Sequence, residues 1–116
     1  MRSVLVVDDV ADVRDLCRVV LESVGYAVSE ATSAEEALVN LTSAAPDYLL
    51  LDLMMPGMSG WDLLRRVRDH HVIDSTRVIV CSAYDGPSEE RRAFGEGAYA
   101  FLAKPFTPQD LIALVI

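Results

Sequence analysis

The sequence predicts an α/β fold, a doubly wound sheet of five parallel strands with helices on both faces. Short runs typical of strands alternate five times with segments of helical periodicity. Such strict alternation is typical of parallel sheets with right-handed crossovers. The 116 residues, 52% of them hydrophobic, are enough for one domain with a buried core, and we expect no second domain.

Each predicted strand is a short run that ends at a polar or turn residue. The five runs are residues 3–7, 27–31, 48–51, 77–81 and 99–102. Most are rich in β-branched residues or leucine, which favour strands.

The first two helices are predicted from apolar periodicity and from their terminal residues. Apolar residues recur at steps of three and four in the first helix, which predicts one buried face and a C-cap at Gly25. The residues of this face are Val13, Leu16, Cys17, Val20, Leu21 and Val24. The second helix begins at Ser33, with Glu36 as the partner in a capping box, and ends before Pro46. Its predicted buried residues are Ala37, Leu38 and Leu41.

The other three helices are predicted from helical periodicity and from prolines. The third spans residues 59–70. His70 and His71 lie at its C-terminus, where positive charge is favoured, and as neighbours on a helix they point in different directions, so we expect a role at the helix end and not a metal site. Pro87 and Pro108 occupy first-turn positions of the fourth and fifth helices. Because the chain stops soon after Pro108, we expect a truncated last helix or a domain excised from a longer protein.

The composition excludes several classes of function. No apolar run approaches the ~20 residues that a membrane-spanning helix needs, and the N-terminus has no secretory signal. Cys17 and Cys81 lack the spacing of metal or redox sites, so we expect free buried thiols and a cytoplasmic location. The net charge of -8 repels nucleic-acid phosphates, so we expect no direct binding to nucleic acid.

Candidate site residues follow four of the five predicted strands. Asp8 and Asp9 follow the first strand, Asp52 the third, Ser82 the fourth and Lys104 the fifth. Each residue alone is ordinary in a turn. The carboxyl ends of parallel strands share one edge of the sheet, where ligands bind, so we expect these side chains to lie together.

This group has the composition of a phosphoryl-transfer site. Three neighbouring carboxylates repel one another and call for a compensating cation. Because no His or Cys is among the predicted ligands, we expect Mg²⁺ or a similar hard ion. A carboxylate can act as the nucleophile, while the metal ion, a hydroxyl group and a lysine neutralise charge on the phosphoryl oxygens.

Four motifs resemble those of the response-regulator receiver domains of two-component signalling. They are VLVVDD at residues 4–9, PDYLLLDLMMPGMSG at 46–60, VIVCSA at 78–83 and GAYAFLAKPF at 97–106. The resemblance runs from Val4 to about Leu114 and implies a flavodoxin-like (βα)5 receiver fold, with residues 1–116 as one receiver domain.

The resemblance implies a role for each matching acidic residue. Asp52 would accept a phosphoryl group from a phosphohistidine on a histidine kinase or a histidine phosphotransfer protein. Asp9, Asp52 and the backbone carbonyl of Met54 would bind Mg²⁺ directly, and Asp8 would act largely through a bound water.

The resemblance also implies a switch and a lifetime for the phosphorylated state. Lys104 would pair with the phosphoryl oxygens, Ser82 would hydrogen-bond one of them, and Phe101 would be the switch aromatic. Repacking would change the face of the fourth helix, fifth strand and fifth helix, where an effector domain or a second copy could bind. Met54 and Tyr84 flank the path of an attacking water and offer no carboxylate or amide, which predicts slow self-dephosphorylation.

The sequence departs from the family pattern at two positions without losing a required group. Tyr99 replaces a residue that is often acidic, and Ser82 stands where threonine is common. The family's usual cis peptide bond would fall at Lys104-Pro105.

Three other functions fit the sequence less well than a non-enzymatic phosphoacceptor does. Phosphatases that form an aspartyl-phosphate intermediate have a second acidic residue two positions after the nucleophile. This chain has Met54 at that position. A flavodoxin-like carrier needs a phosphate-cradling loop after the first strand, and the three aspartates among residues 8–12 would repel phosphate. A degenerate receiver would lack the acidic pair, the acceptor or Lys104, and all are present.

Overall fold

The structure, a computed structural model, describes residues 2–71, 74–83 and 86–115, and its strands form one parallel sheet. The strands are β1 (Ser3–Val7), β2 (Ala27–Ala31), β3 (Tyr48–Asp52), β4 (Arg77–Ser82) and β5 (Ala100–Ala103). The helices are α1 (Ala11–Ser23), α2 (Ala34–Ser43), α3 (Gly60–Asp69), α4 (Pro87–Gly95) and α5 (Pro108–Val115).

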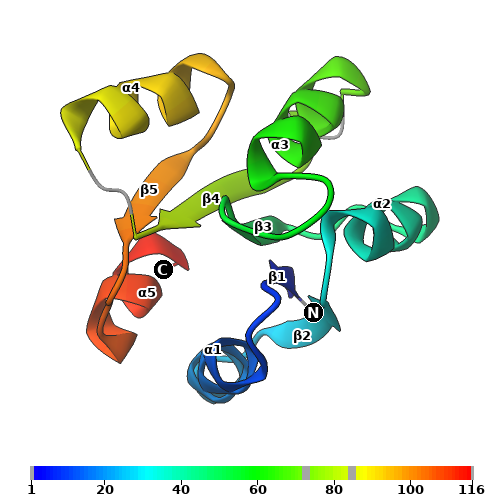
Figure 1. Cartoon of the computed structure of the whole chain (residues 1–116). Coiled ribbons are helices and arrows are strands. Elements are labelled where there is room, and N and C mark those ends of the chain that lie inside the picture. The colour runs from blue at the N-terminus through cyan, green and yellow to red at the C-terminus, as the bar shows by residue number, and fades with distance from the viewer. Residues whose placement is uncertain (1, 72–73, 84–85, 116) are drawn as a thin grey trace.

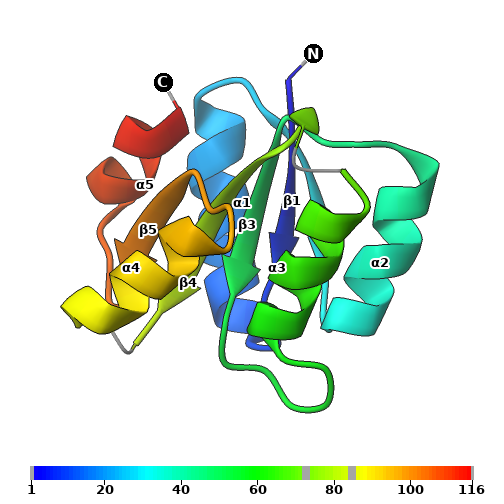
Figure 2. The same ribbon diagram turned by 90° about the horizontal axis from the view of Figure 1, so that it is seen from above.

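The sheet lies between two layers of helices. Its strand order is β2-β1-β3-β4-β5, so the chain reverses its winding direction between β1 and β3. Helices α1 and α5 cover one face, and α2, α3 and α4 cover the other (Figure 1). The turned view shows that the strands run in one direction, so that their carboxyl ends share an edge (Figure 2). The predicted fold class is confirmed, and this edge at the β1/β3 reversal is where ligands bind in such sheets.

The hydrophobic core has two halves, one on each face of the sheet. In β1, Leu5 and Val7 pack on the side of α2, α3 and α4, whereas Val4 and Val6 pack on the side of α1 and α5. All four side chains are buried. Burial on both faces explains why the central strands are continuous apolar runs in the sequence, and it fixes the positions of the strand ends.

Strands β1 and β2 have the predicted bounds, whereas β3, β4 and β5 differ from the prediction by one residue at their ends. Strands β3 and β4 each include one more residue, Asp52 and Ser82, and β5 begins after Tyr99. Asp52 pairs with Cys81 in the register of β3 and β4. A polar side chain does not interrupt a strand, because the hydrogen bonds between strands come from the backbone. Asp52 and Ser82 are therefore held by the sheet itself.

The caps of α1 and α2 largely follow the prediction. Gly25 has φ of 93° after the end of α1, and the next amide, that of Tyr26, donates to the carbonyl of Leu21 as in a Schellman motif. Ser33 caps α2 by accepting from the amide of Glu36 at 3.1 Å. The carboxylate of Glu36 accepts instead from the hydroxyl of Thr32 at 3.0 Å, so the second half of the predicted capping box is formed one residue earlier.

Other side chains in the helices and core test the remaining structural predictions. The prediction that Leu16 is buried is wrong, because it lies at the rim of the apolar stripe of α1 and is 44% exposed. Cys17 and Cys81 are both free and buried, as predicted. His70 is the C-cap of α3, which confirms its place at a helix end. No helix among the described residues is long and apolar enough to cross a membrane.

Candidate functional site

Asp52 lies at the carboxyl end of the central strand β3. Its side chain is almost fully buried, and its Oδ1 accepts a hydrogen bond from the backbone amide of Met54 at 3.1 Å. This local bond restrains the carboxylate next to the loop that follows β3. Met54 itself is exposed, so one side of the loop after β3 faces solvent.

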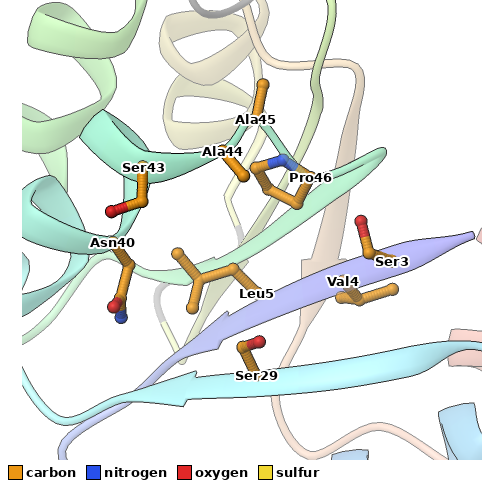
Figure 3. Close-up of a pocket in the computed structure, with 9 residues that line it drawn as sticks. All are labelled: Ser3, Val4, Leu5, Ser29, Asn40, Ser43, Ala44, Ala45 and Pro46. Atoms are coloured by element: carbon orange, nitrogen blue, oxygen red, sulfur yellow. The ribbon is translucent and has the colours of Figure 1, made fainter.

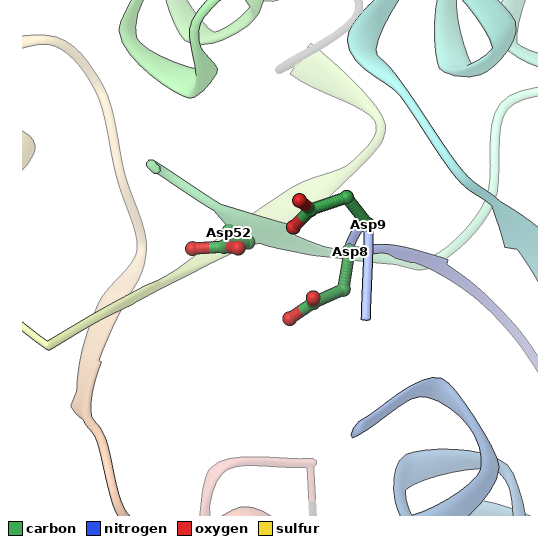
Figure 4. A group of neighbouring side chains, drawn as sticks. All are labelled: Asp8, Asp9 and Asp52. Atoms are coloured by element: carbon green, nitrogen blue, oxygen red, sulfur yellow. The ribbon is translucent and has the colours of Figure 1, made fainter. Parts of the chain in front are cut away.

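Asp8 and Asp9 bring two further carboxylates from the end of β1 to Asp52. One carboxylate oxygen from each of the three residues lies within 4.8 Å of the others (Figure 4). Asp8 is buried and its Oδ1 accepts from the amide of Val10 at 2.9 Å, whereas Asp9 is exposed. The predicted grouping of the acidic residues is therefore present in the structure.

Lys104 reaches this acidic group from the end of β5. Its Nζ lies 2.9 Å from Oδ2 of Asp8 and 3.5 Å from Oδ2 of Asp52. Its backbone amide donates to the carbonyl of Ser82 at 2.9 Å, and the Lys104-Pro105 peptide bond is cis. Ser82 is buried at the end of β4. The four strand ends therefore place three carboxylates, an ammonium group and a hydroxyl at one edge.

Burial and neighbouring charges shift the pKa values of two members of the group. Burial raises the pKa of Asp52, and the charge of Asp8 adds to this against the opposing effects of the Met54 amide and Lys104. Burial lowers the pKa of Lys104, but the hydrogen bond to Asp8 and the charges of both carboxylates outweigh it, so this pKa is raised. Lys104 is therefore charged at neutral pH, but its positive charge does not fully offset the cost of ionising the buried carboxyl of Asp52.

The donor set fits a hard divalent cation. Oxygen atoms from Asp8, Asp9 and Asp52 converge, while Lys104 supplies only one positive charge. Hard ions such as Mg²⁺ bind through one or two carboxylates and keep several waters. Asp8 already accepts from Lys104 and Val10, which leaves the carboxylates of Asp9 and Asp52 as the better candidates for direct ligands.

Two of the predicted switch and lifetime residues, Phe101 and Met54, are among the described residues. Phe101 is partly buried and packs against the core on the side of α2, α3 and α4. Met54 is 53% exposed beside Asp52, and Tyr84 lies outside the described residues.

Two residues at the site were missed by sequence reasoning. Gly60 begins α3 with its amide bonded to the carbonyl of Leu53 at 3.1 Å, and a Cβ there would lie 2.4 Å from the carbonyl oxygen of Asp52. Arg14 of α1 donates to the carbonyl of Asp8 at 2.6 Å. Gly60 follows the capping Ser59 in the motif at 46–60, which was a signal for a close approach. Arg14 gave no such signal, because its partners come from other elements.

A separate hollow of about 290 Å³ lies near the first residues of β1 (Figure 3). Asp8 and Asp9 follow the other end of that strand. Its polar lining residues are Ser3, Ser29, Asn40 and Ser43, and none of the residues that line it is titratable. We therefore assign it no chemistry.

The chain matches the family model described as response regulator receiver domain over residues 4–116. It is 33% identical over 112 residues to the phosphate regulon transcriptional regulatory protein PhoB of Pseudomonas aeruginosa, covering 97% of this chain and 49% of that protein. It is 36% identical over 112 residues to the transcriptional regulatory protein ResD of Bacillus subtilis, covering 97% of this chain and 45% of that protein. The chain thus spans about half the length of these curated relatives.

Solved structures match the fold along nearly the whole chain. The chemotaxis response regulator CheY4 of Vibrio cholerae superposes with a TM-score of 0.92 at 30% identity, covering 99% of this chain and 96% of that one. A putative response regulator from Chloroflexus aurantiacus superposes with a TM-score of 0.91 at 37% identity, covering 98% of this chain and 93% of that one.

Proposed function

Because the chain belongs to the response regulator receiver domain family, whose members act as phosphoacceptor signalling switches, we propose that Asp52 accepts the phosphoryl group. The observation that carries the proposal is the position of its buried carboxylate, beside two other carboxylates and 3.5 Å from the ammonium group of Lys104. The protein would act as a switch that is set by a donor rather than as an enzyme with an external substrate.

The proposed transfer moves one phosphoryl group from a donor nitrogen to a carboxylate oxygen. An oxygen of Asp52 attacks the phosphorus of a phosphohistidine. A phosphorus-oxygen bond forms and the phosphorus-nitrogen bond breaks, and its electron pair stays with the imidazole, so that the histidine of the donor is left unphosphorylated. Lys104 would pair with the phosphoryl oxygens, and the hydroxyl of Ser82 would hydrogen-bond one of them. When bound, Mg²⁺ would neutralise charge on the phosphoryl group. Asp9, Asp52 and the carbonyl of Met54 would hold it, with Asp8 acting through a water.

The proposed partners are a histidine kinase or histidine phosphotransfer protein as donor, and an effector domain or a second copy as receiver of the signal. PhoB and ResD are transcriptional regulators by name, and each is about twice as long as this chain. Phe94 of α4 and Tyr99 beside β5 are 46% and 48% exposed, which gives the α4-β5-α5 face apolar contacts for such a partner. The free thiols Cys17 and Cys81 are compatible with a cytoplasmic location and with residues 1–116 as a receiver module there.

Phosphorylation is expected to shift the protein between two packing arrangements. Ser82 would move toward the phosphoryl group, and Phe101 would turn inward into the space that is freed. After addition of acetyl phosphate and Mg²⁺, we expect backbone NMR shifts at Phe101 and Ala83 as well as around Asp52, and recovery of the original spectrum as the phosphoryl group is lost. Shifts restricted to the neighbours of Asp52 would contradict the switch while leaving phosphorylation intact.

The phosphorylated state is expected to be long-lived. The exposed side chain of Met54 stands beside Asp52 without a carboxylate or amide to orient an attacking water, and Tyr84 is proposed to flank the other side. We expect Met54→Asn to speed hydrolysis severalfold, because an amide can position the water. The loss of phosphoryl groups over time, measured by mass spectrometry, checks this.

The exposed Val39 of α2 provides a matched control for the lifetime experiment. Val39→Asn adds the same amide on an exposed position of α2 and is expected to leave the lifetime unchanged. If Met54→Asn and Tyr84→Glu both lose phosphate no faster than the wild type, the proposal of slow hydrolysis is wrong.

A further inference from the structure

Arg14 of α1 connects the acidic loop after β1 to the edge strand β2. Its side chain is only 14% exposed. One guanidinium nitrogen, Nη1, donates to the backbone carbonyl of Asp8 at 2.6 Å, and another, Nε, lies 3.4 Å from a carboxylate oxygen of Glu30. The guanidinium group of Arg14 is therefore held by two partners, a loop carbonyl and a carboxylate from a strand.

The carbonyl that Arg14 holds belongs to the peptide bond between Asp8 and Asp9. The orientation of that peptide plane sets the direction in which the side chain of Asp9 leaves the backbone. The carboxylate of Asp9 is exposed and has no hydrogen bond or ion pair with any residue in the described parts of the chain. Its position within the acidic group therefore depends on its backbone.

We propose that Arg14 is a positioning residue for the metal site, which it maintains by holding the Asp8-Asp9 peptide so that the carboxylate of Asp9 points toward Asp52. The inference rests on the proposed function and assigns a role outside the residues that would touch the metal ion. Glu30 is the anchor of Arg14, and it also binds Arg18 at 2.6 Å.

Positioning and simple charge predict opposite effects of removing Arg14. A guanidinium group near the three carboxylates repels a divalent cation, so charge alone predicts tighter binding of Mg²⁺ once it is removed. If Arg14 instead orients Asp9, its removal weakens binding, because groups that orient metal ligands contribute strongly to affinity. The sign of the change therefore identifies the role.

Arg18 is a matched control because it lies one turn further along α1 and shares the partner Glu30. It binds Glu30 through two nitrogens, and none of its hydrogen bonds or ion pairs reaches Asp8. We expect calorimetric titration with Mg²⁺ to give a Kd about tenfold higher for Arg14→Gln than for the wild type, and little change for Arg18→Gln. Arg14→Lys keeps the charge but not the fork of donors, so its affinity should also fall.

Melting curves in the absence of Mg²⁺ separate folding from positioning, because only the metal Kd of folded protein is compared. The role of Arg14 would be overturned if the Kd of Arg14→Gln for Mg²⁺ equals or falls below that of the wild type. If Arg14→Gln does not fold, a Kd of Arg14→Lys equal to that of the wild type would overturn it. Asp9→Asn tests the site itself. If the wild type does not bind Mg²⁺, or if Asp9→Asn binds Mg²⁺ as tightly as the wild type does, the proposed metal site is wrong instead.

Discussion

Asp52→Asn is expected to abolish phosphorylation of the protein by acetyl phosphate. The wild type should gain one phosphoryl group when Mg²⁺ is present and none in excess chelator, because phosphoryl transfer brings further negative charge to three carboxylates that Lys104 alone does not neutralise. The amide of the variant keeps the size of the side chain but is not a nucleophile at neutral pH. Intact-mass measurement counts the added groups.

Asp47→Asn is the matched control for this experiment. Asp47 directly precedes β3, at the opposite end of the strand from Asp52, and accepts a hydrogen bond from the amide of Ser3 that an amide oxygen can also accept. The control should be labelled like the wild type. Equal labelling of Asp52→Asn and the wild type would show that the acceptor is a different residue.

The thermal stability of Asp52→Asn provides a check that the variant is folded. Because burial and the charge of Asp8 raise the pKa of Asp52, the folded protein binds the proton more tightly than the unfolded chain does, and ionisation costs stability above the unfolded pKa. Without divalent metal at pH 7, the variant should therefore melt a few degrees above the wild type. The difference should close as the pH falls below the ordinary aspartate value of 3.8, where the carboxyl is protonated in both states.

The sequence predicted that the polar side chains of the site lie together, because their grouping follows from the sheet. Once five apolar runs are identified as parallel strands, Asp8, Asp52 and Lys104 must emerge at one edge, whatever the details of the helices. The same reasoning ended β3 and β4 one residue too early, since it treated a polar side chain as the end of a strand. The backbone of Asp52 continues the ladder, so the proposed acceptor is held by the sheet and not by a loop.

Features that depend on packing between elements could not be predicted. Leu16 fits the apolar period of α1, but whether the rim of a stripe is covered depends on the neighbouring helix and loop. The bond from Arg14 to Asp8 and its anchor at Glu30 join α1, the first loop and β2. In the sequence, an arginine on a helix and a glutamate on an edge strand are typical of exposed positions. Only the folded structure shows that Arg14 contacts both Glu30 and the carbonyl of Asp8.

Gly60→Ala is expected to destabilise the protein by about 2 kcal/mol and to slow phosphorylation of Asp52. An added Cβ would lie 2.4 Å from the carbonyl oxygen of Asp52 and 2.5 Å from Cα of Leu53. Both are backbone atoms of the central strand and its loop, so neither can rotate away. The start of α3 must therefore move away from β3, or the end of β3 that carries Asp52 must move with it. Chemical denaturation and the initial rate of labelling by acetyl phosphate measure the two effects.

Gly95→Ala separates the contact at Gly60 from the general effect of replacing glycine in a helix. Gly95 lies at the end of α4 in ordinary backbone geometry, and a Cβ there meets no atom within 4 Å. Alanine at this position should leave stability unchanged or raise it slightly, since glycine is the poorer helix former. If Gly60→Ala is as stable as Gly95→Ala, α3 does not require this close approach. If Gly60→Ala loses stability but labels at the wild-type rate, α3 absorbs the displacement and the position of Asp52 is independent of that contact.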